Sequence, residues 1–104
     1  MKYLITENRL VDIVDRYLED TVGKLRKYPL DHINARDEDF ELVDKNKDTV
    51  FRYFDYEVGV EENLYIQMLS LFNLKHKELA DIIEKWFSMN FPELVVLNVH
   101  PIIE

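Results

Sequence analysis

Residues 39–59 read DFELVDKNKDTVFRYFDYEVG, and this stretch decides the fold class. It begins with alternating apolar and acidic residues and ends in a run of β-branched and aromatic residues. Between them lies the polar run 44–48, whose residue types favour a tight turn. The pattern predicts a β-hairpin with strands at about 39–44 and 49–58.

Amphipathic helices are predicted on both sides of this hairpin. From Thr6 to about Leu25, apolar side chains recur every three or four residues, as on one face of a helix. Thr6 is a suitable N-cap, and Gly23 predicts the C-terminal end. The same spacing predicts a helix over about 75–90, with an apolar face made of Leu79, Ile82, Ile83, Trp86 and Phe87.

The remaining segments give weaker signals. Residues 28–39 contain Pro29 and a polar run, and predict a loop. Residues 61–72 fit a helix or a strand, and the helix is preferred because Met, Leu and Gln favour it. Residues 94–99 form a short apolar run that predicts a buried strand. We therefore expect one α+β domain over residues 1–104, ordered α-β-β-α-α-β, with helices packed on one face of a mainly antiparallel sheet.

Two stretches resemble small proteins encoded by tailed bacteriophages. The first is Leu4-Ile5-Thr6-Glu7 leading into Leu10, Ile13 and Tyr17-Leu18; the second is Leu69-Ser70-Leu71-Phe72-Asn73-Leu74 followed by Glu78, Ile82-Ile83 and Trp86-Phe87. The resemblance implies a phage origin, with the host cytoplasm or the virion as location. It implies no functional residue.

Charge is concentrated in the middle of the chain. The net charge is −8, and the 104 residues include no cysteine. Residues 31–62 hold eleven acids and four bases, which is a local charge of −7. Proteins that bind phosphate backbones carry a basic stripe, so direct nucleic-acid binding is not expected. No apolar run is long enough for a secretory signal or a membrane span, which predicts a cytoplasmic protein without membrane contact.

No pattern for catalysis or cofactor binding stands out. Asp44-x-Asn46-x-Asp48 matches the first alternate ligands of a calcium loop, but Thr49 replaces the required glycine and Asp55 the bidentate glutamate. The three histidines, His32, His76 and His100, have no spacing that would pair them on a helix. We therefore predict no catalytic residue, no cofactor and no metal, and a protein that is not an enzyme.

The predicted function is protein binding through an acidic surface that also carries aromatic side chains. Aromatic residues are enriched at interface cores, and acids steer basic partners. The predicted partner is a protein with a basic patch. The alternative is a small homo-oligomeric or virion-associated structural protein. The candidate partner-binding residues are Asp37, Glu38, Asp39, Tyr53, Tyr56, Glu57, Glu61 and Glu62.

Overall fold

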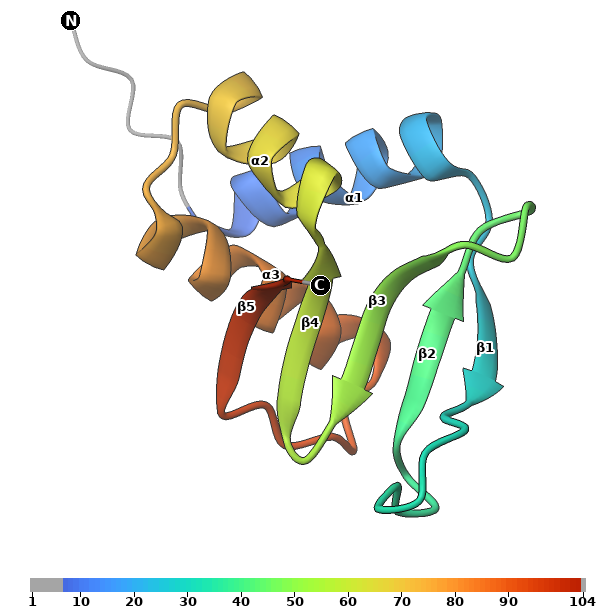
Figure 1. The fold of residues 1–104 in the computed structure, drawn as a ribbon. Coiled ribbons are helices and arrows are strands. Elements are labelled where there is room, and N and C mark those ends of the chain that lie inside the picture. The colour runs from blue at the N-terminus through green and yellow to red at the C-terminus, as the bar shows by residue number, and fades with distance from the viewer. Residues whose placement is uncertain (1–6, 104) are drawn as a thin grey trace, which may run out of the picture.

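Three helices pack against one face of a five-stranded sheet in the computed structural model, which describes residues 7–103 (Figure 1). Thr6, the predicted N-cap of the first helix, lies outside these residues. The elements follow in the order α1 (Glu7–Val22), β1 (Arg26–Pro29), β2 (Phe40–Val43), β3 (Thr49–Phe54), β4 (Glu57–Glu61), α2 (Glu62–Leu71), α3 (His76–Asn90) and β5 (Asn98–Ile102).

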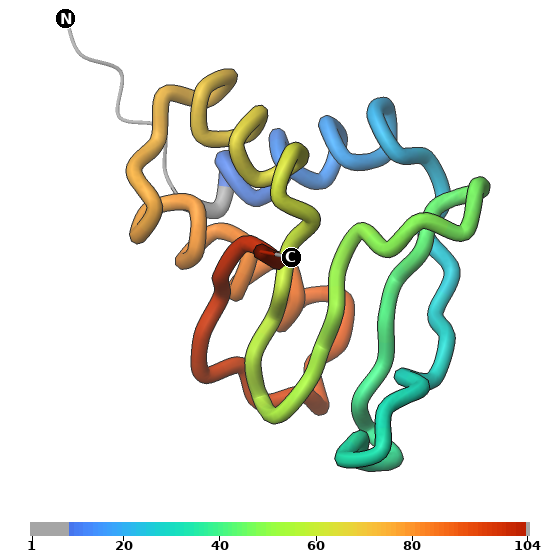
Figure 2. Tube along the Cα trace, viewed as in Figure 1, coloured from blue at the N-terminus to red at the C-terminus, as the bar shows by residue number. Residues whose placement is uncertain are grey.

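The sheet is mixed, with one parallel pair at its edge. The strands lie in the order β1-β2-β3-β4-β5, so neighbours in the chain are neighbours in the sheet. The first three pairings are antiparallel, and β5 pairs with β4 in parallel. Parallel neighbours need a long connection, and α2 and α3 provide it, as the chain trace in Figure 2 shows. The prediction of an α+β fold with a mainly antiparallel sheet is confirmed.

The structure has two strands that the sequence prediction lacked. The predicted loop 28–39 begins inside β1, an edge strand of four exposed residues that pairs with β2. The predicted strand 49–58 is divided into β3 and β4 by a two-residue turn. Both turn residues, Asp55 and Tyr56, have positive φ angles, of 53° and 65°. Two-residue turns with two positive φ angles usually have the sequence Asn-Gly or Asp-Gly. With tyrosine in the second position, the sequence pattern does not indicate a turn.

The last strand lies further along the chain than predicted. The apolar segment 94–97 is not a strand; it crosses the end of the sheet, and β5 begins at Asn98 opposite Glu57. Within the segment Leu94 and Val96 pack against the core, while Val95 and Leu97 are exposed. The apolar residues of segment 94–97 therefore belong to a partly buried connection between α3 and β5, and not to a paired strand.

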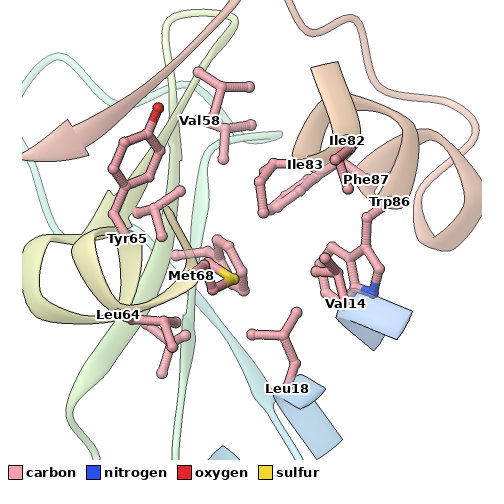
Figure 3. Packing of buried hydrophobic residues seen from close by; sticks show 14 of the residues in the cluster. Val14, Leu18, Val58, Leu64, Tyr65, Met68, Ile82, Ile83, Trp86 and Phe87 are labelled. Atoms are coloured by element: carbon pink, nitrogen blue, oxygen red, sulfur yellow. The ribbon is translucent and has the colours of Figure 1, made fainter. Parts of the chain in front are cut away.

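The predicted helices are present, including the preferred helix in the ambiguous segment 61–72, which is α2. Gly23 follows α1 with a φ of +71°, the left-handed conformation that often ends a helix. One buried cluster joins all three helices to the sheet (Figure 3). Trp86 of α3 stacks on Phe51 of β3, and Phe87 contacts Phe51 edge to face. The Trp86 indole N–H donates to the Asp15 carboxylate at 2.8 Å.

Successive residues of the strands point to opposite faces of the sheet. Phe51 and Tyr53 point into the helix-covered core, and Val58 and Val60 do the same from β4. Arg52 and Phe54 alternate with them and are half-buried. We call this second side the open face, because no helix among residues 7–103 covers it (Figure 1).

Candidate functional site

The structure divides the eight predicted partner-binding residues between the two ends of β4. Glu61 and Glu62 lie where this strand ends and α2 begins. The other six lie in the loop before β2, in β3 and around the β3–β4 turn; they are Asp37, Glu38, Asp39, Tyr53, Tyr56 and Glu57. A five-residue strand separates the two groups by roughly 13 Å. They therefore form two surfaces rather than one.

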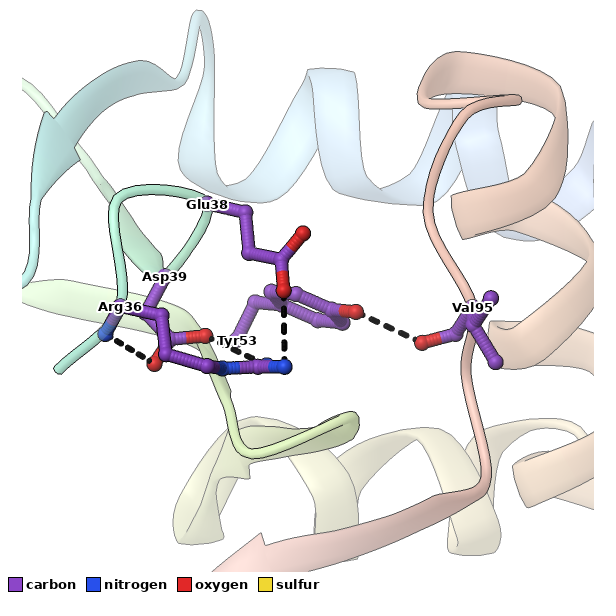
Figure 4. A network of polar contacts seen from close by, with 5 residues as sticks. All are labelled: Arg36, Glu38, Asp39, Tyr53 and Val95. Atoms are coloured by element: carbon purple, nitrogen blue, oxygen red, sulfur yellow. Dashed lines mark hydrogen bonds and ion pairs between the residues drawn. The ribbon is translucent and has the colours of Figure 1, made fainter.

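Arg36 fastens the loop before β2 to the β3–β4 turn. Its guanidinium lies 2.7 Å from the Glu38 carboxylate and 3.0 Å from the Asp39 carboxylate (Figure 4). Its backbone N–H also donates to Asp39, at 2.9 Å. The guanidinium carbon lies 3.9 Å from the centre of the Tyr56 ring, a cation–π contact. One arginine thus holds the acidic loop against the turn.

Asp39 belongs to this internal network rather than to the surface. Burial works against its ionisation, since the residue is only 2% exposed. Hydrogen bonds from the backbone and side chain of Arg36 outweigh burial, and they lower the pKa of Asp39 below its ordinary value. The hydrogen bond to Asp39 raises the pKa of Arg36 in turn. Asp39 is charged at neutral pH, but a partner cannot reach it in this conformation.

Tyr53 is likewise withdrawn from the predicted surface. It is 1% exposed, its ring stacks on Phe40 in the core, and its hydroxyl donates to the Val95 carbonyl oxygen at 2.7 Å (Figure 4). Burial raises the pKa of Tyr53. Because β3 alternates its side chains, Tyr53 shares the buried face with Phe51.

Tyr56 remains exposed, and the structure brings new residues to it. Its carbonyl oxygen accepts a hydrogen bond from the Leu97 N–H at 2.7 Å. Leu97 and Val95 are 72% and 54% exposed, although their segment was predicted to be a buried strand. We call this surface the acidic end; it comprises Asp37, Glu38, Asp55, Tyr56, Val95 and Leu97. Nothing in the sequence pattern placed segment 94–97 beside the turn.

The two glutamates at the other end of β4 have different roles. Glu61 caps α2, because its carboxylate accepts hydrogen bonds from the backbone N–H groups of Asn63 and Leu64, at 3.1 and 2.7 Å. Glu62 is exposed in the first turn of the helix, where a negative charge is favourable. Both line a pocket of about 600 Å³ beside the β2–β3 turn. The capping hydrogen bonds explain the position of Glu61 without any binding partner.

In the β2–β3 turn, the Asp44 side chain is hydrogen-bonded to the backbone of the turn itself. The Asp44 carboxylate accepts hydrogen bonds from the N–H groups of Asn46 and Asp48, at 2.8 and 3.1 Å. Within residues 7–103, no three His, Cys, Asp or Glu side chains are grouped so that they could hold a metal ion. His32 contacts Phe54, and His76 contacts Tyr65. His100 is in β5 and lines the same pocket as His76.

Comparison with known proteins identifies no relative of this chain. No protein-family model, curated protein or solved structure matches this chain significantly. The resemblance to small phage proteins therefore stays a prediction. In the part of the chain that the structure describes, no helix is long and apolar enough to cross a membrane.

Proposed function

We propose that this chain is a non-enzymatic protein-binding module that holds the basic surface of a partner against its acidic end. One observation carries the proposal: exposed apolar groups of Tyr56, Val95 and Leu97 lie in two segments joined by a hydrogen bond, beside exposed acids. Protein interfaces combine an apolar and aromatic centre with a polar rim. The acidic end has this composition.

The acidic end is also held in place before any partner binds. Arg36 contacts Glu38, Asp39 and Tyr56, and the Tyr53 hydroxyl holds the Val95 carbonyl. A surface that is already ordered loses less conformational entropy on association. Rigidity of this kind favours a recognition surface over a merely solvating acidic loop.

The charge of the acidic end favours a basic protein over a nucleic acid. Asp37, Glu38 and Asp55 are exposed, while the guanidinium of Arg36 is already engaged by carboxylates. Complementary charge accelerates encounter with a basic surface, and it repels phosphate backbones.

The edges of the sheet are less suited to partner binding. β1 carries Arg26 and Lys27 and ends at Pro29, and β5 contains Pro101. Charged residues and prolines on edge strands discourage the addition of a further strand. We therefore place recognition at the end of the sheet instead of along its edges.

The test is capture of proteins by three immobilised forms of the chain. The parent is compared with Asp37→Lys/Glu38→Lys and with a control, Glu19→Lys/Asp20→Lys, which makes the same charge change on α1. A specific partner should be lost with the first variant and retained by the second. Capture should also weaken between about 0.1 M and about 1 M salt, because the screening length falls from about 10 to about 3 Å.

Two outcomes would contradict the proposal. The first is a partner that binds the acidic-end variant as well as the parent at both salt concentrations. The second is a solution mass of two or more chains that falls to one chain in Leu97→Ser. That result would assign the exposed apolar residues to self-association and favour the structural alternative.

A further inference from the structure

A row of five residues crosses the open face, one from each strand. The pairing register aligns Tyr28 with Glu41, Glu41 with Arg52, Arg52 with Gly59, and Gly59 with His100. Arg52 is therefore at the centre of the sheet. Its neighbour on β4 is a glycine, so no β4 side chain stands beside it in the row.

Arg52 has no partner among residues 7–103. Its Nε atom is buried and has no acceptor, and its guanidinium forms neither an ion pair nor a side-chain hydrogen bond with them. A buried donor without an acceptor costs free energy, and arginine in protein structures is usually paired when it is withdrawn from water. The atom is thus suited to an acceptor supplied from outside.

Three of the nearby carboxylates are engaged with other groups and do not pair with Arg52. Glu41, directly across from Arg52 on β2, accepts from the Thr49 hydroxyl at 3.0 Å. Glu61 caps α2, and Glu57 accepts from the Asn98 side chain at 3.1 Å. The same acids surround Arg52 with negative charge without pairing to it.

Three pockets meet at Arg52, and two of them lie on the open face. One, of about 510 Å³, runs along β4 and β5 and is lined by Phe54, Gly59 and Ile102. The second, of about 380 Å³, lies under the loop before β2 and is lined by Leu30 and Phe54. The third is the pocket of about 600 Å³ beside the β2–β3 turn. Apolar walls therefore adjoin the unpaired guanidinium.

We infer that Arg52 is the binding site for a carboxylate attached to an apolar group. The guanidinium presents parallel N–H donors that match the two oxygens of a carboxylate. The apolar part of the ligand then lies on Phe54 and Ile102. A phosphate dianion fits less well, because Glu41, Glu57 and Glu61 line the same pockets and repel a second negative charge. This site lies on the open face, so it does not depend on the acidic end.

The experiment is a titration of the isotope-labelled full chain with benzoate, acetate and inorganic phosphate, followed by amide NMR. Benzoate should give saturable shifts confined to residues around Arg52, and it should bind more tightly than acetate or phosphate. Arg52→Gln should weaken benzoate binding by at least about tenfold, the factor that corresponds to 1.4 kcal/mol. The matched control is Arg16→Gln, which removes the same charge from the exposed side of α1 and should leave binding unchanged.

Two further ligands identify the source of the carboxylate. A short peptide with an apolar C-terminal residue and a free carboxylate is compared with the same peptide amidated at its C-terminus. Binding of only the free acid assigns the site to chain ends, and binding of benzoate alone assigns it to small acids. The inference fails if no carboxylate gives saturable shifts, if Arg52→Gln retains them while its circular dichroism is unchanged, or if phosphate binds most tightly.

Discussion

The two faces of β3 differ in how deeply their side chains are buried and in whether the polar ones have hydrogen-bond partners. Phe51 and Tyr53 on the covered face are at most 1% exposed, and Tyr53 has a hydrogen-bond acceptor for its hydroxyl. Arg52 and Phe54 on the open face are half-buried, and Arg52 keeps a buried nitrogen without an acceptor among residues 7–103. The covered face is therefore optimised for stability. The open face retains one buried donor, the Arg52 Nε atom, that no described residue satisfies.

The sharpest test of this comparison is a pair of substitutions on the same strand. Phe51→Ala should lower the free energy of unfolding by about 3–5 kcal/mol, because the ring is fully buried between Trp86 and Phe87. Phe54→Ala should cost less than about half as much, since its side chain is only half-buried. Chemical denaturation measures both values. Equal costs would mean that the open face is as much a core as the covered one.

The helix side of the same core should be almost as sensitive. Ile83→Ala removes a fully buried side chain of α3 and should cost about 2–5 kcal/mol. Trp86→Ala should act in the same direction, with loss of the hydrogen bond to Asp15 added. Met89→Ala is the matched control, because this α3 residue is 66% exposed. Thermal melts should separate the core variants from the control, and coincident melts would refute the assigned face of α3.

In the network beneath the acidic end, Asp39→Asn should cost about 1–2 kcal/mol, since it weakens hydrogen bonds to a partly exposed arginine. The pKa of Asp39 is lowered on folding, so its contribution is full above its ordinary pKa of 3.8. The contribution is lost as pH falls through the folded pKa. The stability difference between parent and variant should therefore be largest near neutral pH and shrink in acid. A difference independent of pH would exclude this linkage.

The smallest effect is expected where β4 leads into α2. Glu61→Ala removes two hydrogen bonds to the helix N-terminus and should cost about 1 kcal/mol. Glu62→Ala, one residue later and exposed, should cost less than about 0.5 kcal/mol. Denaturation midpoints compare the two. A larger cost at Glu62 would assign the stabilisation to helix-dipole charge instead of capping.

Much of the candidate surface could not be predicted from the sequence. Alternation along 49–58 places Phe51 and Tyr53 on the same face of the strand but does not say which face is the core. The structure buries both, although Tyr53 is one of the predicted partner-binding residues. Asp39 is buried because Arg36, three residues before it, supplies both a backbone and a side-chain donor. Val95 and Leu97 were missed because their exposure depends on where the chain leaves α3 and how it reaches β5.

The sequence by itself determined α1, α3, the turn at Asp44–Asp48 and the α+β class, and it favoured a helix over a strand where α2 lies. These features depend on spacing and residue type within a few turns of chain, so local information suffices. Only the tertiary structure decided that β1 exists, that Asp55 and Tyr56 split a strand, and that β5 begins at Asn98. It also decided that Arg52, at the centre of the sheet, has a buried nitrogen without an acceptor in the part of the chain that the structure describes. Strands and ion pairs depend on partners distant in the chain, and no local pattern specifies those partners.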